Sequence, residues 1–436
     1  MNLKLGQITA VVISSSSAAK EVLQKQDVDF CTRSVPDAVT ADNHSRNSVV
    51  FLPANSNWRS LRKILNSYIF SANRIDANLQ LRSRKVEDLM AYVQKSCETG
   101  EAVDIGQAAF RTSLNLLSNL FFSKDLTDPF SDSAKEFKNV IWDIMVEAGT
   151  PNVVDFFPLL RLLDPQGNRR RMSSHFSKVF QMFKGIITER LSESRESGFG
   201  ISKDVLDDLL AFSKEAPEEF DRNLIEHIFL DLFAAGTDTT SSTLEWAMTE
   251  LLRNPRTLKR AQAELAETVG RGKQIEETDL PRLPYLQCIV KETMRMHPAV
   301  PFLVPRKVER DVELLGFIVP GGSQVLVNAW AIGRDENVWG TDALAFKPER
   351  FLESEIDIRG RDFELIPFGA GRRICPGLSL AVKMIPVVLG SLLNVFDWKL
   401  EGGIAPEKLD MEEKFGFTLQ KARALRAVPL ALLIEN

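Results

Sequence analysis

Apolar residues recur at three- and four-residue intervals along most of this chain, which is the spacing of one face of an α-helix. The pattern predicts helices over much of residues 58–195 and again over residues 257–269 and 285–296. The longest helical pattern covers residues 221–253 and would span about 50 Å if the helix is unbroken. A last helix is predicted over residues 376–394. The chain is therefore expected to be mainly α-helical.

Short strands and loops separate these helices. The chain opens with two alternating stretches, LKLGQ and AVVISS, that predict strands, and a helix is expected from Ser17 to Gln26. Residues 306–333 combine β-branched residues with a Gly-Gly pair, as small sheets do, and residues 419–433 predict a closing hairpin. Residues 151–165 predict an apolar loop, residues 196–217 a polar and charged exposed connection, and residues 338–370 irregular structure.

One mainly helical domain with small β-sheets, covering residues 1–436, accounts for these patterns. A chain of this length would more often form two or three domains. This one shows no internal repeat, no low-complexity tract and no clear linker. No apolar run reaches the roughly 20 residues that a membrane-spanning helix needs.

Composition excludes several classes of function. Hydrophobic residues make up 44% and charged residues 26% of the chain, as in soluble globular proteins. The net charge of −5 argues against a nucleic-acid-binding protein. The four cysteines form no CxxC pair, which favours a reducing compartment without disulfides.

Cys375 stands in PFGAGRRICPG, directly before the last predicted helix. Pro376 suits the first helical position, so we expect Cys375 to be the N-cap, where backbone N–H groups and the helix dipole favour a thiolate. Neighbouring glycines would let a flat, bulky group approach, and Arg373 offers that group a cation. The alternative is a small apolar cap residue. No Gly-Lys-Ser/Thr follows, so a phosphate loop is disfavoured, and no histidine lies nearby to activate a nucleophile.

The pattern Phe368-x-x-Gly371-x-Arg373-x-Cys375-x-Gly377 resembles the haem-binding signature of the cytochrome P450 family. The resemblance implies that Cys375 is the thiolate ligand of the iron of haem b, and that Phe368, Arg373 and Gly377 lie beside this cofactor. It implies the fold of that family, with haem between the long central helix and the last long helix. It also implies O2 as oxidant and electrons from NADPH. NADPH-cytochrome P450 reductase would deliver these electrons, and cytochrome b5 is a further candidate partner.

AAGTDTTSS, in the middle of the long predicted helix, allows two interpretations. The helix could end near Gly236 and a second helix could begin at Ser242, capped by the box that Ser242 forms with Glu245. Alternatively the helix continues, and the hydroxyl of Thr239 turns to the carbonyl four residues back. Asp238 and Thr239 would then form an acid–alcohol pair able to relay protons. The stretch resembles the family's oxygen-activation motif, which implies that role.

Two further motifs belong to the predicted core. Glu292 and Arg295 share a helix face and can pair, although such pairs are usually exposed and weak. KETMRMHP and the later FKPERF resemble the family's Glu-x-x-Arg and Pro-Glu-Arg-Phe motifs. The resemblance implies a buried cluster of Glu292, Arg295 and Arg350 with a structural role.

WRSLRK places Trp58 and Arg62 one helical turn apart. They could simply begin an amphipathic helix. The resemblance instead implies that both contact a haem propionate, as does Arg306. Four basic residues also form a possible docking patch for an acidic redox partner: Arg59, Arg62, Lys63 and Arg372. The patch lacks the aromatic residues and motifs of a nucleic-acid site.

Long stretches, among them LKLGQITAVVISSS, AAFRTSLNLLSNL and VLVNAWAIGRDENVW, resemble the plant members of the family that oxidise monoterpenols. This resemblance implies NADPH-driven 8-hydroxylation of geraniol or nerol in terpenoid biosynthesis. Apolar segments, including a late turn near Phe415, would form the substrate pocket, with these lining residues: Phe51, Ala234, Val300, Leu303 and Phe417. Alternatives are the same chemistry on another small hydrophobic plant metabolite, and a truncated haem-binding remnant without activity.

Members of that family also begin with a membrane anchor and a proline-rich hinge, and they face the cytosol from the endoplasmic reticulum membrane. Neither segment is recognisable in these 436 residues. The resemblance implies this location, and we expect a monomer.

Overall fold

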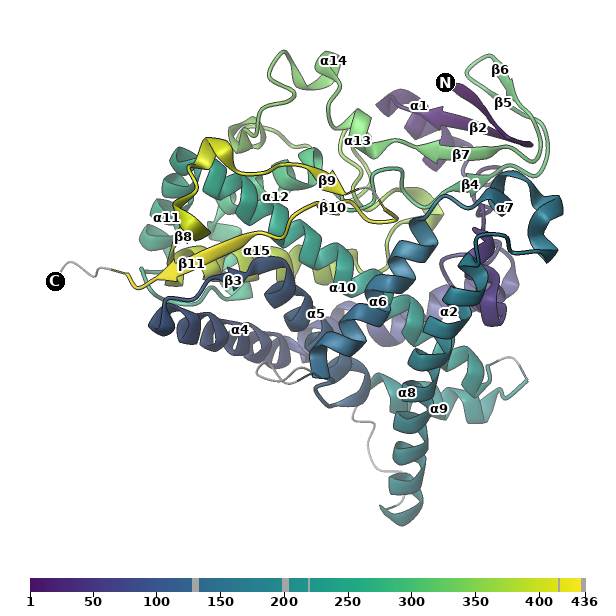
Figure 1. The fold of residues 1–436 in the computed structure, drawn as a ribbon, viewed down its shortest axis with the longest axis horizontal. Coiled ribbons are helices and arrows are strands. Elements are labelled where there is room, and N and C mark those ends of the chain that lie inside the picture. Colours follow the sequence, from purple (N-terminus) through teal and green to yellow (C-terminus); the bar gives the residue numbers. More distant parts are fainter. Residues whose placement is uncertain (128–132, 198–203, 219, 415, 433–436) are drawn as a thin grey trace.

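The computed structural model describes residues 1–127, 133–197, 204–218, 220–414 and 416–432. Its centre is the helix α10, Arg222–Arg253, which begins at the N-cap Asp221 and continues without interruption. Helix α5 (Ile105–Phe122) packs along α10, and α12 (Pro284–Met296) and α15 (Leu378–Val395) lie against it (Figure 1). The unbroken α10 excludes the alternative of two helices divided near Gly236.

The other helices surround this centre, and shorter 3-10 and π-helical turns join them (Figure 1). The remaining α-helices are α1 (Ser16–Lys20), α2 (Ser56–Ile64), α3 (Ala72–Ala77), α4 (Leu79–Thr99), α6 (Ser133–Gly149), α7 (Val153–Phe156), α8 (Asn168–Ser197), α9 (Val205–Glu215), α11 (Pro255–Thr268), α13 (Ala329–Ile332) and α14 (Glu336–Trp339). By length and composition α15 could cross a membrane, but it is a mostly buried core helix that contacts α4, α10, α11 and α12.

Four small sheets complete the fold. The largest has the strand order β1-β2-β7-β4, with β2 parallel to β7 and the other pairs antiparallel. It lies at the edge of the molecule opposite the sheet β3-β11-β8 (Figure 1). The strands are β1 (Asn2–Leu5), β2 (Ile8–Ile13), β3 (Val103–Asp104), β4 (Arg306–Lys307), β5 (Val312–Leu314), β6 (Phe317–Val319), β7 (Gln324–Val327), β8 (Asp397–Leu400), β9 (Glu413–Lys414), β10 (Gln420–Lys421) and β11 (Arg426–Leu430).

The structure confirms the mainly helical fold with small sheets and corrects several segments. The helix expected from Ser17 to Gln26 is α1 followed by a π-helical turn, Glu21–Lys25. The predicted loop at 151–165 contains α7 and the 3-10 helix Pro158–Leu162.

Two further predictions, for residues 196–217 and for residues 419–433, are wrong. Within the supposed exposed connection at 196–217, α9 buries four apolar side chains, those of Val205, Leu206, Leu209 and Leu210. The predicted closing hairpin does not form, because β10 pairs with β9 while β11 lies between β3 and β8. Residues 198–203 and 433 of these two segments lie outside the described residues.

Candidate functional site

Cys375 lies in the loop between the 3-10 turn Gly371–Arg373 and α15, and its N–H donates to the Phe368 carbonyl at 3.0 Å. The N-cap of α15 is Gly377, so the prediction that Cys375 caps the helix is wrong. The backbone N–H groups of Gly377 and Leu378 nevertheless hydrogen-bond the sulfur. Burial raises the pKa of the Cys375 thiol, and these N–H groups and the charge of Arg62 oppose that rise. The sulfur therefore has local donors that suit a thiolate.

Gly371 serves packing rather than the approach of a flat ligand. Its φ of +67° is in the left-handed region, and a Cβ atom there would lie 1.9 Å from the Leu23 carbonyl oxygen. The loop can therefore dock on the π-helical turn after α1 only with glycine at this position.

Cys375 faces a cavity of about 300 Å³ whose walls are mainly apolar. Helices α5, α10 and α15 form much of the wall, together with residues 299–306 and the turn at 417–418. Three predicted lining residues do lie there: Val300, Leu303 and Phe417. Residue 415, near which the late turn was predicted, lies outside the described residues.

Two predicted lining residues are corrected by the structure. Phe51 is buried in the apolar core beside the cavity, where Val49 and Val50 form the wall instead. On α10 the helical phase directs Ala235, Gly236 and Thr239 to the cavity, and Ala234 is not part of the wall. Sequence reasoning also missed the contribution of α5 to the wall, although the apolar face of this helix was visible as a helical stripe. The wall residues from α5 include Ala109, Leu116 and Leu117.

Four arginine side chains line the cavity together: Arg33, Arg62, Arg306 and Arg373. Their hydrogen bonds within the described residues go to backbone carbonyls, and no carboxylate there pairs with them. Arg373 donates to the Cys31 carbonyl at 3.0 Å, and Arg306 to the Phe30 carbonyl at 3.0 Å. Burial lowers the pKa of each guanidinium, to about 10 for Arg306 and for Arg373.

The buried Nε of Arg306 has no hydrogen-bond partner. Buried charges are normally compensated, so this cluster fits an anionic group with more than one carboxylate. Arg33, in CTRS, carried no sequence signal for this role.

Trp58 supports the arginine cluster rather than donating into the cavity. Its indole N–H donates to the Val49 carbonyl at 3.1 Å, and the guanidinium of Arg373 lies 4.3 Å from the centre of its ring. Arg62 donates to the Ile374 carbonyl, directly before Cys375. Trp58 therefore holds Arg373 by stacking, while Arg62 ties α2 to the cysteine loop.

The middle of α10 presents Thr239 to the cavity. Its hydroxyl donates to the Ala235 carbonyl at 2.7 Å, four residues back as predicted. The adjacent Asp238 is 3% exposed, and its carboxylate accepts hydrogen bonds from the Thr418 hydroxyl and the Gln420 amide. The two side chains of the predicted acid–alcohol pair therefore point to different surroundings.

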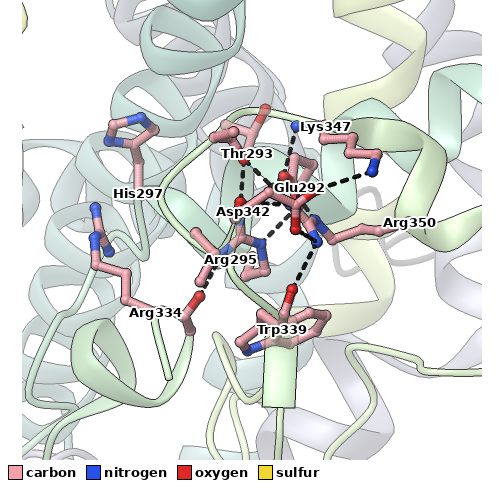
Figure 2. Close-up of polar contacts among 12 residues, drawn as sticks. Glu292, Thr293, Arg295, His297, Arg334, Trp339, Asp342, Lys347 and Arg350 are labelled. Carbon is pink, nitrogen blue, oxygen red and sulfur yellow. Dashed lines mark hydrogen bonds and ion pairs between the residues drawn. The ribbon is translucent and has the colours of Figure 1, made fainter. Parts of the chain in front are cut away.

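Glu292, Arg295 and Arg350 form the buried cluster that the motifs predicted (Figure 2). Arg295 makes two hydrogen bonds to the Glu292 carboxylate, at 2.7 and 2.8 Å, and Arg350 donates to the same carboxylate at 3.0 Å. The backbone N–H of Lys347 adds a further bond at 2.7 Å. The cluster joins α12 to the segment 343–350, and none of its three residues lines the cavity.

The motif around Cys375, the long helix with Thr239 and the buried Glu292 cluster have a counterpart among known proteins. Residues 1–425 match the family model of cytochrome P450. The chain belongs to the cytochrome P450 family. It is 68% identical to a geraniol 8-hydroxylase from Catharanthus roseus over 99% of this chain and 87% of that protein. It is 64% identical to a geraniol 8-hydroxylase from Swertia mussotii over the same shares.

A zebra fish cytochrome P450, in a structure with progesterone, is similar in fold, with a TM-score of 0.82 and 27% sequence identity. That similarity covers 98% of this chain and 96% of the other. Membership of the family makes this chain a haem monooxygenase that uses O2 and electrons from a redox partner.

The residues of the cavity fit haem. A sulfur with backbone donors faces the cavity, and four guanidinium groups without a described carboxylate partner can bind the two propionates. We therefore assign Cys375 as the residue that would hold the iron, and the arginine cluster as the residues that would hold the acidic edge.

Proposed function

We propose that this cytochrome P450 hydroxylates a monoterpenol, geraniol or nerol, at its C8 allylic methyl group. One atom of O2 enters the C–H bond, and the other leaves as water with two electrons and a proton from NADPH and a second proton from solvent. The observation that carries the proposal is the 68% identity, over 99% of this chain, to a protein named geraniol 8-hydroxylase. An apolar cavity lined by Val300, Leu303 and Phe417 supports it, because it suits a ligand with a single hydroxyl.

Each residue then has a defined task. Bound haem supplies the oxygen chemistry, which thiolate donation favours. Cys375 holds the iron, Arg33, Arg62, Arg306 and Arg373 compensate the propionates, and Phe368 and Gly377 give the loop its shape. The hydroxyl of Thr239, which lines the cavity, would relay a proton that comes from solvent. Asp238 would join this relay only after releasing Thr418 or Gln420.

Electrons would arrive from NADPH-cytochrome P450 reductase, or with cytochrome b5, at the face that carries the cysteine loop. Arg59, Lys63 and Arg372 are exposed, with Arg372 paired to Asp27, whereas Arg62 lines the cavity. A cluster of cations suits an acidic partner. We further propose that the chain acts as a monomeric, single-domain enzyme at the cytosolic face of the endoplasmic reticulum.

Two measurements test this function. The haem-loaded protein, reduced under carbon monoxide, should show a Soret band shifted far to the red, and Cys375→Ala should lose it. With reductase, NADPH and geraniol, the enzyme should form the 8-hydroxylated alcohol. It should prefer geraniol to a panel of diterpenoid and phenylpropanoid substrates. A normal band without geraniol turnover would overturn the substrate, and no haem at all would overturn the enzyme.

A further inference from the structure

One face of α10 binds the C-terminal segment of the chain over two helical turns. Asp238 accepts from Thr418 and Gln420, and the Ser242 hydroxyl donates to the Leu419 carbonyl at 2.7 Å. Glu245 accepts from the backbone N–H of Leu425 at 2.7 Å. Asp238, Ser242 and Glu245 are spaced i, i+4 and i+7, so they share a face.

The same segment forms part of the cavity wall. Phe417 and Thr418 line the cavity, and the N–H of Leu419 donates to the Ala299 carbonyl at 2.8 Å. On its other side the turn touches the end of α6, where a Cβ atom at Gly149 would lie 2.2 Å from the Phe417 nitrogen. The turn is thus enclosed by α6, residue 299 and the polar face of α10.

Within this enclosure Asp238 is the buried anchor. It is 3% exposed, and its two carboxylate oxygens accept from the residues on either side of Leu419. Hydrogen bonds to a charged acceptor are stronger than those between neutral groups. A loss of this anchor would free the turn that carries Phe417 and change the cavity next to Thr239.

We propose that Asp238 is a positioning residue that determines substrate fit, because it holds Phe417 and Thr418 in the cavity wall from the polar face of α10. The inference deepens the proposed function and rests on it for the identity of the ligand. A proton-relay role of the carboxylate is separate from this one, because positioning needs hydrogen-bond acceptors and not a titratable group.

Conservative replacement separates the two roles. Asp238→Ala should weaken geraniol binding by about tenfold, measured as the Kd from the optical shift of the haem-loaded enzyme, and should change the ratio of hydroxylated isomers. Asp238→Asn should restore both quantities, since its amide can bond Thr418, and Gln420 can present its own oxygen. An Asn variant as impaired as Ala in Kd would overturn the proposal, and so would a wild-type Kd in the Ala variant.

A double-mutant cycle tests whether Asp238 acts through Thr418. The loss of affinity in Asp238→Ala combined with Thr418→Val should be smaller than the product of the two single losses. If the loss of affinity in the double variant equals the product of the two single losses, the proposal is overturned. Ser241→Ala is the matched control, because it removes a buried hydroxyl of α10 that bonds the carbonyl of Asp238 in the same helix.

Amide hydrogen exchange of the peptide covering residues 416–422 needs no substrate. It should rise in Asp238→Ala and return to the wild-type rate in Asp238→Asn. Unchanged exchange in the Ala variant would overturn the positioning role even if geraniol proves to be the substrate. Faster exchange in an enzyme that binds no geraniol would support the anchor and refute only the proposed ligand.

Discussion

Arg33 and Arg306 lie opposite each other across an antiparallel β-bridge, and both side chains line the cavity that Cys375 faces. Burial, followed by the charge of Arg306, lowers the pKa of Arg33 well below its usual range. Burial lowers the pKa of Arg306 to about 10. Two like charges this close and this buried weaken the protein unless an anion joins them. The haem propionates of this family are such anions.

Arg306→Met should therefore have opposite effects on two forms of the protein. Haem retention should fall by about 10- to 100-fold, because a hydrogen bond to a charged group contributes roughly 1.5–3 kcal/mol. The haem-free protein should melt at a higher temperature, since a buried charge is removed. Haem transfer to a scavenger protein measures the first effect. Arg372→Met is the control, because Arg372 is exposed and pairs with Asp27; equal retention in both variants would contradict the assignment.

Glu292→Gln should destabilise the fold by about 3–5 kcal/mol, because it leaves two buried guanidinium groups without their carboxylate. Glu292 and Arg295 are both fully buried. The Arg350 side chain and the backbone N–H of Lys347 bond the same carboxylate oxygen of Glu292. The free energy of unfolding in urea measures the loss. Glu401→Gln breaks the exposed pair with Arg426 and should leave the free energy of unfolding nearly unchanged. A similar cost for both substitutions would show that the buried cluster is not a lock.

Thr239→Ala should keep the red-shifted band of the reduced carbon monoxide complex, because Thr239 does not hold haem. The yield of hydroxylated product per NADPH should fall by about tenfold or more, with hydrogen peroxide formed in its place. Thr249→Ala is the matched control on the same helix, since Thr249 is buried and its hydroxyl bonds the Glu245 carbonyl at 2.7 Å. Undiminished coupling in the Thr239 variant would exclude the relay.

The features that sequence predicted well are those with a local signal. The length of α10 followed from helical spacing, and the Glu292 cluster followed from two motifs. The pocket residues were less certain, because one residue of helical phase separates Ala234 from Ala235, and only the second reaches the cavity. Phe51 lies in a turn before α2, where no helical phase predicts which side chain reaches the cavity, and Val49 and Val50 line it instead.

The features that sequence missed are set by distant contacts. Strands of two residues, such as β9 and β10, have too little pattern to reveal their partners. The polar residues of α9 concealed buried positions, including Leu206 and Leu209, that are visible only once α5 packs against them. Arg33 entered the site because the fold places it opposite Arg306, 273 positions away in numbering.

Acid should weaken the protein through His227. This side chain is buried, and its Nδ1 lies 2.9 Å from Nδ1 of His44. Burial, followed by the charge of His44, lowers the pKa of His227 from 6.5 to about 4, although Asp231 and Asp221 act in the opposite direction and Lys184 adds slightly to the decrease.

The imidazole of His227 binds a proton more readily in the unfolded chain than in the folded protein. The stabilisation from burying the neutral imidazole is therefore present above pH 6.5 and is lost as the pH falls through about 4. The loss should approach about 3 kcal/mol in urea unfolding at pH 7 and pH 4. His227→Gln should flatten this dependence. His175→Gln, at a half-buried site, should leave it unchanged, and an unaltered slope in the His227 variant would contradict the assignment.

Gly371 and Gly403 allow the packing of the cysteine loop to be separated from backbone strain. Their φ angles are +67° and +68°, so alanine meets the same left-handed penalty of about 1 kcal/mol at either position. A Cβ atom at Gly403 has no neighbour within 4 Å, whereas at Gly371 it would lie 1.9 Å from the backbone oxygen of Leu23.

Gly371→Ala must therefore move the loop away from the π-helical turn Glu21–Lys25 and should cost about 1–3 kcal/mol more than Gly403→Ala. Because the Cys375 N–H bonds the Phe368 carbonyl within that loop, the shift should also reduce haem content and broaden the Soret band. The free energy of unfolding and the haem-to-protein ratio measure both effects. If the two alanine variants are equally stable and equally loaded, the contact between residues 371 and 23 does not position the cysteine.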